Sequence, residues 1–378
     1  MKRLKVLAMI VAVVLLAAIA AGCGGSGSSG GASPAPSGGG ASPAPSGGGA
    51  SPAPSQDNKV YNVGFSVKDQ TNPLFVDMVT AARETIDNYN KAAGYEKIKL
   101  NVQACTGETK VEEQLTTCET FLTQDVDAII CTPLNSDAFV DFVKRCNDEK
   151  VAFINLDTMV NPDMLKSIGA NFDVFIGSDN IWLGENVTRA MVEDFPDGCK
   201  YFVLGGNPGA ATHIGMDQGY NNIKATMSAG FIELKYELCN WQEPQALETT
   251  SNLLPTYPEV QAIIAFNDQM AQGAIAAIES FGKTPGTDIK VYGSNFVGNA
   301  PQFIVDGKQA YSQSRRPLYS GQLAAECAIN FIDGKTPIHE LIDTATRLIE
   351  FPGTVFRQGL FTLKDGKPYD MNGNFIYN

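Results

Sequence analysis

The sequence predicts an α/β protein made of two doubly wound lobes, each with a parallel sheet, joined by a hinge of crossing strands. Strand-length apolar runs alternate with helical stretches whose apolar residues recur three and four positions apart, as between Leu74 and Ile86. Strands that alternate with helices build parallel sheets covered on both faces. The alternation occurs twice in tandem. The part expected to fold, residues 59–378, is also too long for a single hydrophobic core, so two lobes are expected.

Four strand-length runs open the pattern, at residues 60–67, 97–105, 126–133 and 151–157. Proline follows Asn72 after the first run, and proline is typical of the first turn of a helix. Thr109 with Glu112 three residues later resembles a capping box, which predicts a second helix start.

The pattern then repeats with further strands and helices. The strands are expected at residues 173–178, 200–206, 231–238, 260–266 and 288–294. The helices are expected to begin near Trp182, Met216, Glu243 and Gln269. We assign residues 59–177 and 316–345 to an N-terminal lobe, and residues 178–315 and 346–378 to a C-terminal lobe. In the tail, KDGK (364–367) and MNGN (371–374) predict turns, and we expect the tail to pack across the hinge or on the second lobe.

Residues 1–22 have the layout of a bacterial secretion signal, with a basic start, an apolar run and small residues before Cys23. The small residues resemble a lipobox, which predicts that Cys23 is lipidated and becomes the new N-terminus. A plain cleaved signal is the alternative, because Ala20 stands where lipoproteins usually carry leucine. Residues 23–58 repeat the unit ASPAPSGGG and cannot bury a core, so we expect a disordered linker that holds the folded part off a membrane.

Composition argues against several functions. The net charge of −13 repels nucleic acid and anionic lipid, so we expect no nucleic-acid partner. With two histidines and no CxxC pair, the chain predicts no metal site. The first strand leads into VGFSVKDQTNP, which lacks the glycines of a dinucleotide-binding turn, so no cofactor is expected. The predicted lobes contain no GxSxG motif and no singled-out carboxylate pair, so we do not expect an enzyme.

Seven cysteines follow Cys23, and this odd number leaves at least one thiol free. We expect free, buried cysteines. A disulfide between Cys118 and Cys146, which fall on successive predicted helices, is the alternative.

Short polar or aromatic side chains follow most of the predicted strands. They include Asn72, Phe75, Thr132, Asn155, Asp157, Trp241, Asn267, Asp268, Asn295 and Arg315. Doubly wound sheets bind ligands at the carboxyl ends of their strands, so we expect these side chains to line one cleft between the lobes. Amides and carboxylates hydrogen-bond hydroxyls, and aromatic faces cover the C–H face of a sugar ring. The pattern therefore favours a polyol site.

The chain resembles the ribose/galactose type of periplasmic sugar-binding proteins of ABC transporters, the type I periplasmic binding proteins. The matching stretches cover most of residues 59–350 and are NPLFVDMVTAARE, VDAIICTPLNSDAF, VAFINLDT, TYPEVQAIIAFNDQMAQGAIAAIESFG and VYGSNF. The resemblance implies a Venus-flytrap fold whose lobes close around one small ligand by hinge motion. It implies recognition of the closed form by a permease, and no catalysis. We expect a monomer.

Carried over by position, the ligand contacts of the family fall on Asn72, Phe75, Asp157, Trp241, Asn267, Asn295 and, on the hinge side, Arg315. By this resemblance Phe75 and Trp241 stack on a sugar ring, and Asn267 bonds its hydroxyls. Asp157 accepts from hydroxyls, whereas Asp268 caps the following helix. The alternatives are a packed surface role for Trp241 and a turn role for Asp157.

The chain departs from the ribose-binding pattern at several positions. Thr158 stands where ribose binders commonly carry arginine, and Met216 lies near the place of a second arginine. Leu74 replaces a frequent aromatic residue, and Asn295 a frequent aspartate. These departures argue against ribose itself and leave another pentose, a hexose or a related polyol. His213 is a further candidate contact, as in some galactose/glucose binders, with a helix-entry residue as the alternative.

The expected partners are a sugar or polyol, an ABC permease and a membrane reached through the lipid anchor alone. This places the folded part on the extracytoplasmic face of the cell membrane. One alternative is a sensor that docks on a membrane receptor. Another is a binder of a non-sugar solute such as a nucleoside or a quorum signal.

Overall fold

The structure is a computed structural model that describes residues 58–334, 348–351, 354–358, 361–365 and 367–370. The predicted signal, the lipidation site at Cys23, all of the predicted linker except its last residue, and the predicted turn at 371–374 lie outside the described residues. The residues from Asp57 onward form one compact unit. Within the described part of this unit, no helix is both long and apolar enough to cross a bilayer.

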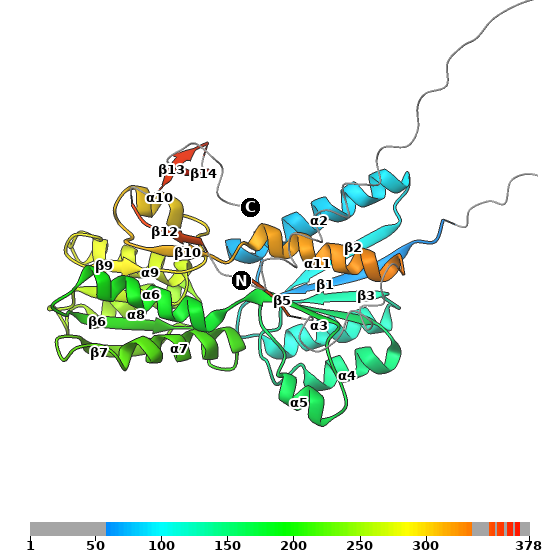
Figure 1. Ribbon diagram of the computed structural model, residues 1–378, viewed down its shortest axis with the longest axis horizontal. Helices are drawn as coiled ribbons and strands as arrows, with labels where there is room; N and C mark the ends of the chain where they lie inside the picture. The colour runs from blue at the N-terminus through cyan, green and yellow to red at the C-terminus, as the bar shows by residue number, and fades with distance from the viewer. Residues whose placement is uncertain (1–57, 335–347, 352–353, 359–360, 366, 371–378) are drawn as a thin grey trace, which may run out of the picture. The chain divides into compact units, whose positions relative to one another are not determined.

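The first lobe is built on a six-stranded sheet with the order β11-β5-β4-β3-β1-β2, in which all neighbours are parallel. Its strands are β1 (Tyr61–Val67), β2 (Ile98–Ala104), β3 (Ala128–Cys131), β4 (Ala152–Leu156), β5 (Val174–Ser178) and β11 (Leu348–Phe351). One face is covered by α2 (Pro73–Ala93) and α11 (Pro317–Ile332), and the other by α3 (Val111–Thr123), α4 (Val140–Glu149) and α5 (Pro162–Ser167) (Figure 1). Neighbouring strand residues serve opposite faces, since Ile130 packs toward α2 and α11 and Ile129 toward α3 and α4.

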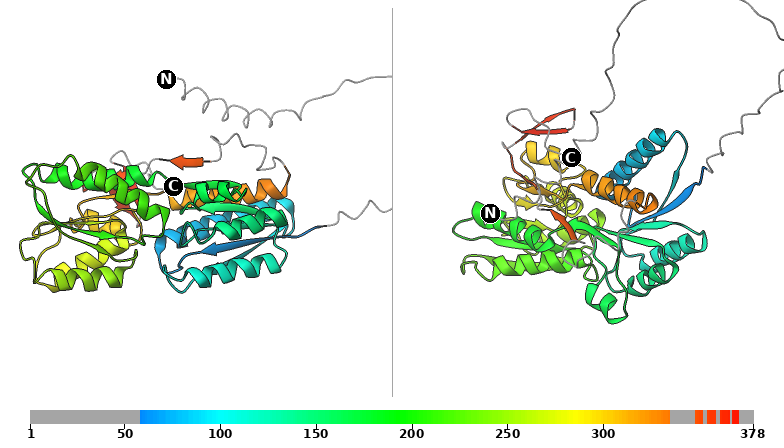
Figure 2. Two further views of the ribbon diagram at one scale, coloured as in Figure 1. Left: turned by 90° about the horizontal axis from the view of Figure 1, so that it is seen from below. Right: turned by 45° about the vertical axis from the view of Figure 1, so that its right-hand side comes forward.

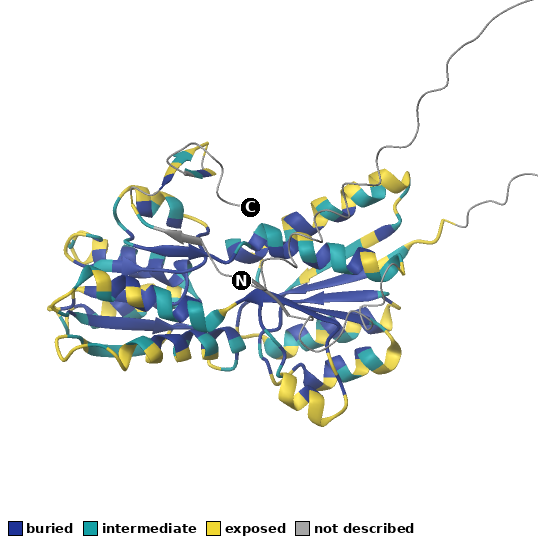
Figure 3. Ribbon diagram, in the orientation of Figure 1, coloured by how far each residue is buried: buried dark blue, intermediate teal, exposed yellow. Residues whose placement is uncertain are grey.

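The second lobe has a four-stranded parallel sheet with the order β7-β6-β8-β9. Its strands are β6 (Lys200–Gly205), β7 (Ile232–Leu238), β8 (Ala262–Ala265) and β9 (Lys290–Tyr292). Its helices are α6 (Asn180–Asp194), α7 (Ala211–Lys224), α8 (Glu243–Leu253), α9 (Asp268–Ser280) and the short α10 (Ala300–Val305). In both further views each sheet lies between its own helices (Figure 2). The inner strands β3, β4, β5 and β8 are buried, whereas β2 and β7 are partly exposed and the outer helices carry many exposed residues (Figure 3). The predicted α/β class with two parallel sheets is confirmed.

Helix starts were predicted with mixed success. Asn72 caps α2 by accepting from Leu74 N at 3.0 Å, and proline occupies the first turn as expected. The predicted capping box at Thr109 is wrong, because α3 begins at Val111 and its preceding residue makes no side-chain cap. Helix α7 begins at Ala211, five residues before the predicted start near Met216. The apolar residue of its first turn, Ile214, is exposed and so gave no sign of a buried helix face.

The chain passes between the lobes at three places. Strand β5 leads into α6, and β10 (Ser312–Ser314) leads back into α11. Strand β11 then precedes β12 (Thr354–Phe356), which pairs antiparallel with β10. The assignment of all of residues 346–378 to the second lobe is therefore wrong for β11. This strand pairs in parallel with β5, with Leu348 opposite Phe175, and covers an edge that the first sheet would otherwise leave open.

The C-terminal tail ends, within the described residues, in a hairpin of β13 (Phe361–Lys364) and β14 (Lys367–Asp370). Lys364 pairs with Lys367, so the hairpin turn falls where KDGK predicted it. The hairpin contacts α10 of the second lobe (Figure 1), which is one of the two places expected for the tail.

The seven cysteines after Cys23 are all free, and six of them are buried. Cys118 and Cys146 pack in the same apolar cluster of the first lobe without a disulfide between them. Burial raises the pKa of the Cys105 thiol to about 12, so this cysteine stays protonated at neutral pH.

Candidate ligand-binding site

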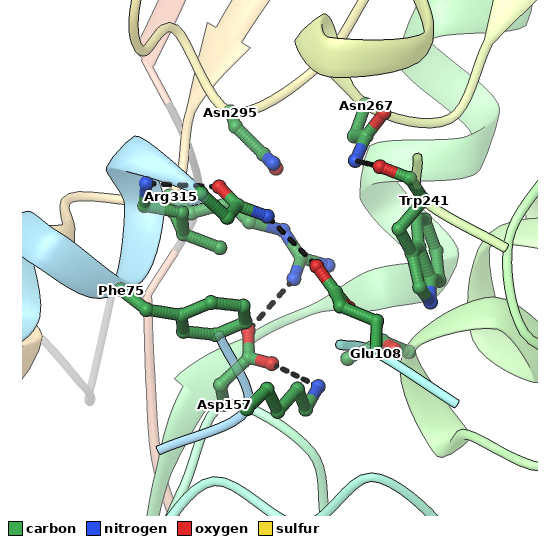
Figure 4. A pocket seen from close by; sticks show the side chains of 11 residues that line it. Phe75, Glu108, Asp157, Trp241, Asn267, Asn295 and Arg315 are labelled. Carbon is green, nitrogen blue, oxygen red and sulfur yellow. Dashed lines mark hydrogen bonds and ion pairs between the residues drawn. The ribbon is translucent and has the colours of Figure 1, made fainter. Parts of the chain in front are cut away.

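One pocket gathers residues from both lobes (Figure 4), and its empty space, which includes open solvent, is about 270 Å³. It is lined by Lys68, Asn72, Leu74, Phe75, Glu108, Asp157, Thr212, Trp241, Asn267, Asn295 and Arg315. Seven of the eight predicted site residues are therefore brought together. The eighth, His213, does not line the pocket.

A buried ion cluster lies on the first-lobe side. Lys68 Nζ donates to Asp157 Oδ2 at 2.8 Å, and Arg315 Nη1 donates to Asp157 Oδ1 at 2.9 Å. The exposed fractions of these side chains are 3%, 5% and 7% for Lys68, Asp157 and Arg315. Burial acts to raise the pKa of Asp157, but the two cations outweigh it and hold that pKa below its ordinary value. Asp157 was predicted to accept from ligand hydroxyls. Each of its oxygens already accepts from a cation, and acceptance from a ligand hydroxyl stays a prediction.

Lys68 supplies a cation beside Asp157, where Thr158 stands in the position at which an arginine was expected. Its ammonium group also bonds the hydroxyl of Thr158, which in turn donates to Asp157 Oδ2 at 3.1 Å. Thr158 therefore holds a cation that comes from the end of β1. Sequence reasoning missed Lys68, although a lysine that directly follows a buried strand is the available signal.

Glu108 is the second pocket residue that sequence reasoning missed. It is 4% exposed, and its Oε1 accepts from Asn72 Nδ2 at 2.9 Å. Burial raises the pKa of Glu108 to about 7, against the opposing effects of Lys68 and Asn72. The signal for this residue was its place in the loop that follows β2, at the same sheet edge as the other site residues.

The capping role predicted for Asp268 belongs to Asn267, which also lines the pocket. Asn267 is the cap of α9, because its backbone is extended and its Oδ1 accepts from Met270 N at 2.8 Å. Asp268 is already helical and is wholly buried instead. Its carboxylate accepts from Val297 N at 3.2 Å and from Gln309 Nε2 at 2.7 Å. Burial raises the pKa of Asp268 to about 7.

The amide of Asn267 also fixes the backbone at Trp241. Its Nδ2 donates to the Trp241 carbonyl at 2.9 Å, which leaves its second N–H for other partners. Trp241 is 8% exposed, so it is not the surface aromatic of the alternative interpretation. It has φ +68°, and its ring packs so closely on Gly206 that a Cβ there would lie 2.1 Å from it.

His213 lies behind this tryptophan rather than in the pocket. Its Nδ1 accepts from Gly206 N at 3.2 Å, and its ring meets the Trp241 ring edge-on with centroids 6.3 Å apart. Burial lowers the pKa of His213, so the neutral ring is favoured. The structure thus gives His213 a supporting position, and its neighbour Thr212 lines the pocket.

Phe75 and Asn295 complete the wall from opposite lobes. Phe75 is 2% exposed and has the Lys68 ammonium group 5.4 Å from its ring centroid. Asn295 has φ +108°, and its backbone N–H donates to Gln313 O at 2.7 Å. Among the described residues its side-chain amide has no recorded hydrogen bond, so it is available to a ligand.

Direct hydrogen bonds also join the lobes beside the pocket. Ser136 N donates to Gly209 O at 3.0 Å, and Ala211 N donates to Ser136 Oγ at 2.8 Å. Asn207 Nδ2 reaches the Glu108 carbonyl at 3.4 Å. The described residues contain no group of three His, Cys, Asp or Glu side chains that would hold a metal ion.

The comparisons with known proteins agree with this geometry. The model of the periplasmic binding protein domain matches residues 63–336, and the chain belongs to this family. The fold is that of the type I periplasmic binding proteins, with its two α/β lobes around a ligand pocket.

The chain is similar to several sugar-binding relatives. It is 28% identical over 281 residues to the ribose import binding protein RbsB of Bacillus subtilis, a match that covers 74% of this chain and 85% of that one. It is 27% identical over 230 residues to the fructose import binding protein FruE of Bifidobacterium longum, covering 60% and 67%. Among solved structures, an Actinobacillus succinogenes solute-binding protein with bound D-allose has a TM-score of 0.69 at 24% identity, covering 79% of this chain and 98% of that one.

The ion cluster yields a stability prediction. Lys68→Met should lower the free energy of unfolding by about 3–5 kcal/mol, because it leaves a buried carboxylate with one cation fewer. Lys144→Met is the control, since Lys144 bonds Asp148 at the surface and its loss should cost at most about 0.5 kcal/mol. Urea unfolding measures both variants. Equal, small losses would contradict the importance of the cluster.

The raised pKa of Glu108 predicts a pH dependence. Its ordinary value is 4.5 and its folded value is about 7, so the folded state binds more protons between these values. Stability should therefore fall as pH rises from 4.5 to 7, by on the order of 1–3 kcal/mol from this group. Glu108→Gln keeps an acceptor for Asn72 but cannot titrate. Its stability relative to the wild type should rise over that pH range, and a difference that stays flat would show that Glu108 is ionised throughout.

Proposed function

We propose that the protein captures a monosaccharide or a related polyol between its lobes and delivers it to an ABC importer. One observation carries the proposal: two aromatic side chains, Phe75 from the first lobe and Trp241 from the second, share a pocket with amide, carboxylate and cationic groups. Aromatic faces suit the C–H faces of a sugar ring, and the polar groups suit its hydroxyls. Binding a ligand from both sides also joins the lobes.

The hydrogen-bonding capacity of the pocket supports a hydroxyl-rich ligand. Asn267 and Asn72 each use one N–H for the protein and retain another, and the Asn295 amide retains its full capacity. Arg315 Nε is buried and has no partner among the residues that the structure describes, although Arg315 lines the pocket. A buried donor without a partner costs about 1–3 kcal/mol, which a ligand oxygen would recover.

Hinge closure follows from the same geometry. The three passages between the lobes allow one lobe to rotate against the other. A ligand that contacts both lobes stabilises the closed arrangement by its differential affinity for it. The pocket presents binding groups and no activated nucleophile, so we infer binding without catalysis.

The solute is inferred as a class. Curated relatives are named for ribose, allose and fructose, and solved relatives hold D-allose and myo-inositol. These ligands share adjacent hydroxyls on a small skeleton. The cation supplied by Lys68 rather than by an arginine after Asp157 favours a pattern of hydroxyls different from that of ribose.

Membership of the family places the folded part outside the cytoplasm. We infer that lipidation at Cys23 and the linker of residues 23–58 tether it, as a monomer, to the membrane. Tethering raises its effective concentration near an ABC permease, so that capture and delivery occur close together.

A ligand panel tests the proposal directly. The unit of residues 57–378, unfolded and refolded to remove co-purified solute, is melted with D-allose, D-ribose, D-fructose, myo-inositol, nucleosides and signal molecules. A sugar at 100 times its Kd adds about 2.7 kcal/mol and should raise the Tm by several degrees. A shift from a nucleoside or signal molecule alone would keep the fold and overturn the sugar class.

Asn267 provides a test at residue level. Asn267→Ala should weaken binding of the ligand that the panel identifies by about 1–3 kcal/mol, because a ligand hydroxyl loses its partner. Asn90→Ala is the matched control. Its amide also accepts from one backbone N–H and donates to one carbonyl, both at Ile98, but does not line the pocket. Calorimetric titration should show unchanged affinity for Asn90→Ala, and wild-type affinity in both variants would remove Asn267 from the site.

A further inference from the structure

The C-terminal hairpin lies behind the loop that carries Asn295. Phe361 of β13 packs on Phe296, with ring centroids 5.3 Å apart and the planes at 82°. These two rings form a small apolar cluster with Ile304 of α10, and all three side chains are at most 4% exposed. Phe296, which directly follows the pocket residue Asn295, is therefore held in place by the C-terminal hairpin.

The tail is fastened to the second lobe before it reaches this cluster. Arg357 Nη1 donates to Asp194 Oδ1 at 2.9 Å, and its Nη2 donates to the Ala190 carbonyl at 3.1 Å. Its guanidinium group also lies 5.5 Å from the ring centroid of Tyr311. Gln358 Nε2 then donates to Val305 O at 3.1 Å. These contacts fix the approach of β13 to α10.

The supported loop has an unusual backbone. Asn295 and Phe296 have φ +108° and +56°, a region that residues other than glycine rarely occupy. Such conformations persist only where the surroundings over-determine them. Here Phe296 N donates to Ser312 Oγ at 3.1 Å, and the packed Phe296 ring adds a second restraint. The two consecutive residues serve opposite sides, since Asn295 lines the pocket and Phe296 enters the cluster.

We infer that Phe361 is a positioning residue for ligand recognition. By holding the Phe296 ring, it fixes the neighbouring Asn295 amide in the pocket, so the C-terminal hairpin sets affinity and selectivity at a site that it does not touch. This inference rests on the proposed function, because it requires that a ligand contact Asn295.

The test is a double-mutant cycle in the chain of residues 57–378, titrated with D-allose, D-ribose, D-fructose and myo-inositol. Phe361→Ala should weaken binding of the probe that the wild type binds most tightly by about 5–50-fold. It should also change the order of affinity among the four probes. Phe361→Leu, which keeps an apolar side chain in the cluster, should recover most of the affinity and protects the test if the alanine variant does not fold. In an Asn295→Ala background, adding Phe361→Ala should weaken binding by less than a further twofold, because the Asn295 amide through which Phe361 acts is gone.

Tyr257→Ala is the matched control. Tyr257 meets Phe202 edge-on in the same lobe, at 5.8 Å and 79°, and does not line the pocket. It should lower the Tm as Phe361→Ala does while affinity stays within twofold. If the wild type binds a probe and Phe361→Ala binds it with the same affinity, the inference is overturned and the proposed function stands. Additive losses of affinity in the double-mutant cycle would have the same meaning. Failure of the wild type to bind any of the four probes would overturn the proposed sugar function and the inference with it.

Discussion

The carboxylate of Asp157 between two cations is the interaction on which the site depends. A buried carboxylate is tolerable only when it is paired and hydrogen-bonded, and here its partners come from distant parts of the chain. Lys68 follows β1, whereas Arg315 lies where β10 passes into α11. Arg315 also bonds Asn180 at the start of α6. One charge therefore ties the centre of the first sheet to two of the passages between the lobes.

The two lobes accordingly contribute different chemistry. The first-lobe side supplies fixed charges whose positions follow from neutralising Asp157, and Glu108 adds a carboxyl group whose burial favours its neutral form. The second lobe supplies Trp241 with the amides of Asn267 and Asn295. A ligand must satisfy a rigid charged wall and an amide-and-aromatic wall together. This requirement suits a small molecule with hydroxyls around a compact apolar skeleton.

Much of this arrangement could be predicted because its signals are local. Buried parallel strands are unbroken apolar runs, so the ends of the predicted strands lie within two residues of the observed ones. Polar residues at strand ends converge because the carboxyl ends of parallel strands do. Lys68 and Glu108 were missed because a charged residue in a loop looks solvent-exposed until its burial is known. The place of β11 depends on a partner far away in the sequence. The cap of α9 was assigned to Asp268 instead of Asn267 because the helix starts at Asp268 itself.

The second-lobe wall shows why residues that never touch a ligand still matter to it. Trp241 and Asn295 both have positive φ, so each is held in a conformation that its own side chain disfavours. Such a conformation costs on the order of 1–3 kcal/mol, and surrounding contacts must offset it. His213 and the Asn267 amide provide them at Trp241, and Phe296 with Phe361 does so at Asn295. Recognition in this lobe is therefore built in two layers, and the outer layer extends to the last described strands of the chain.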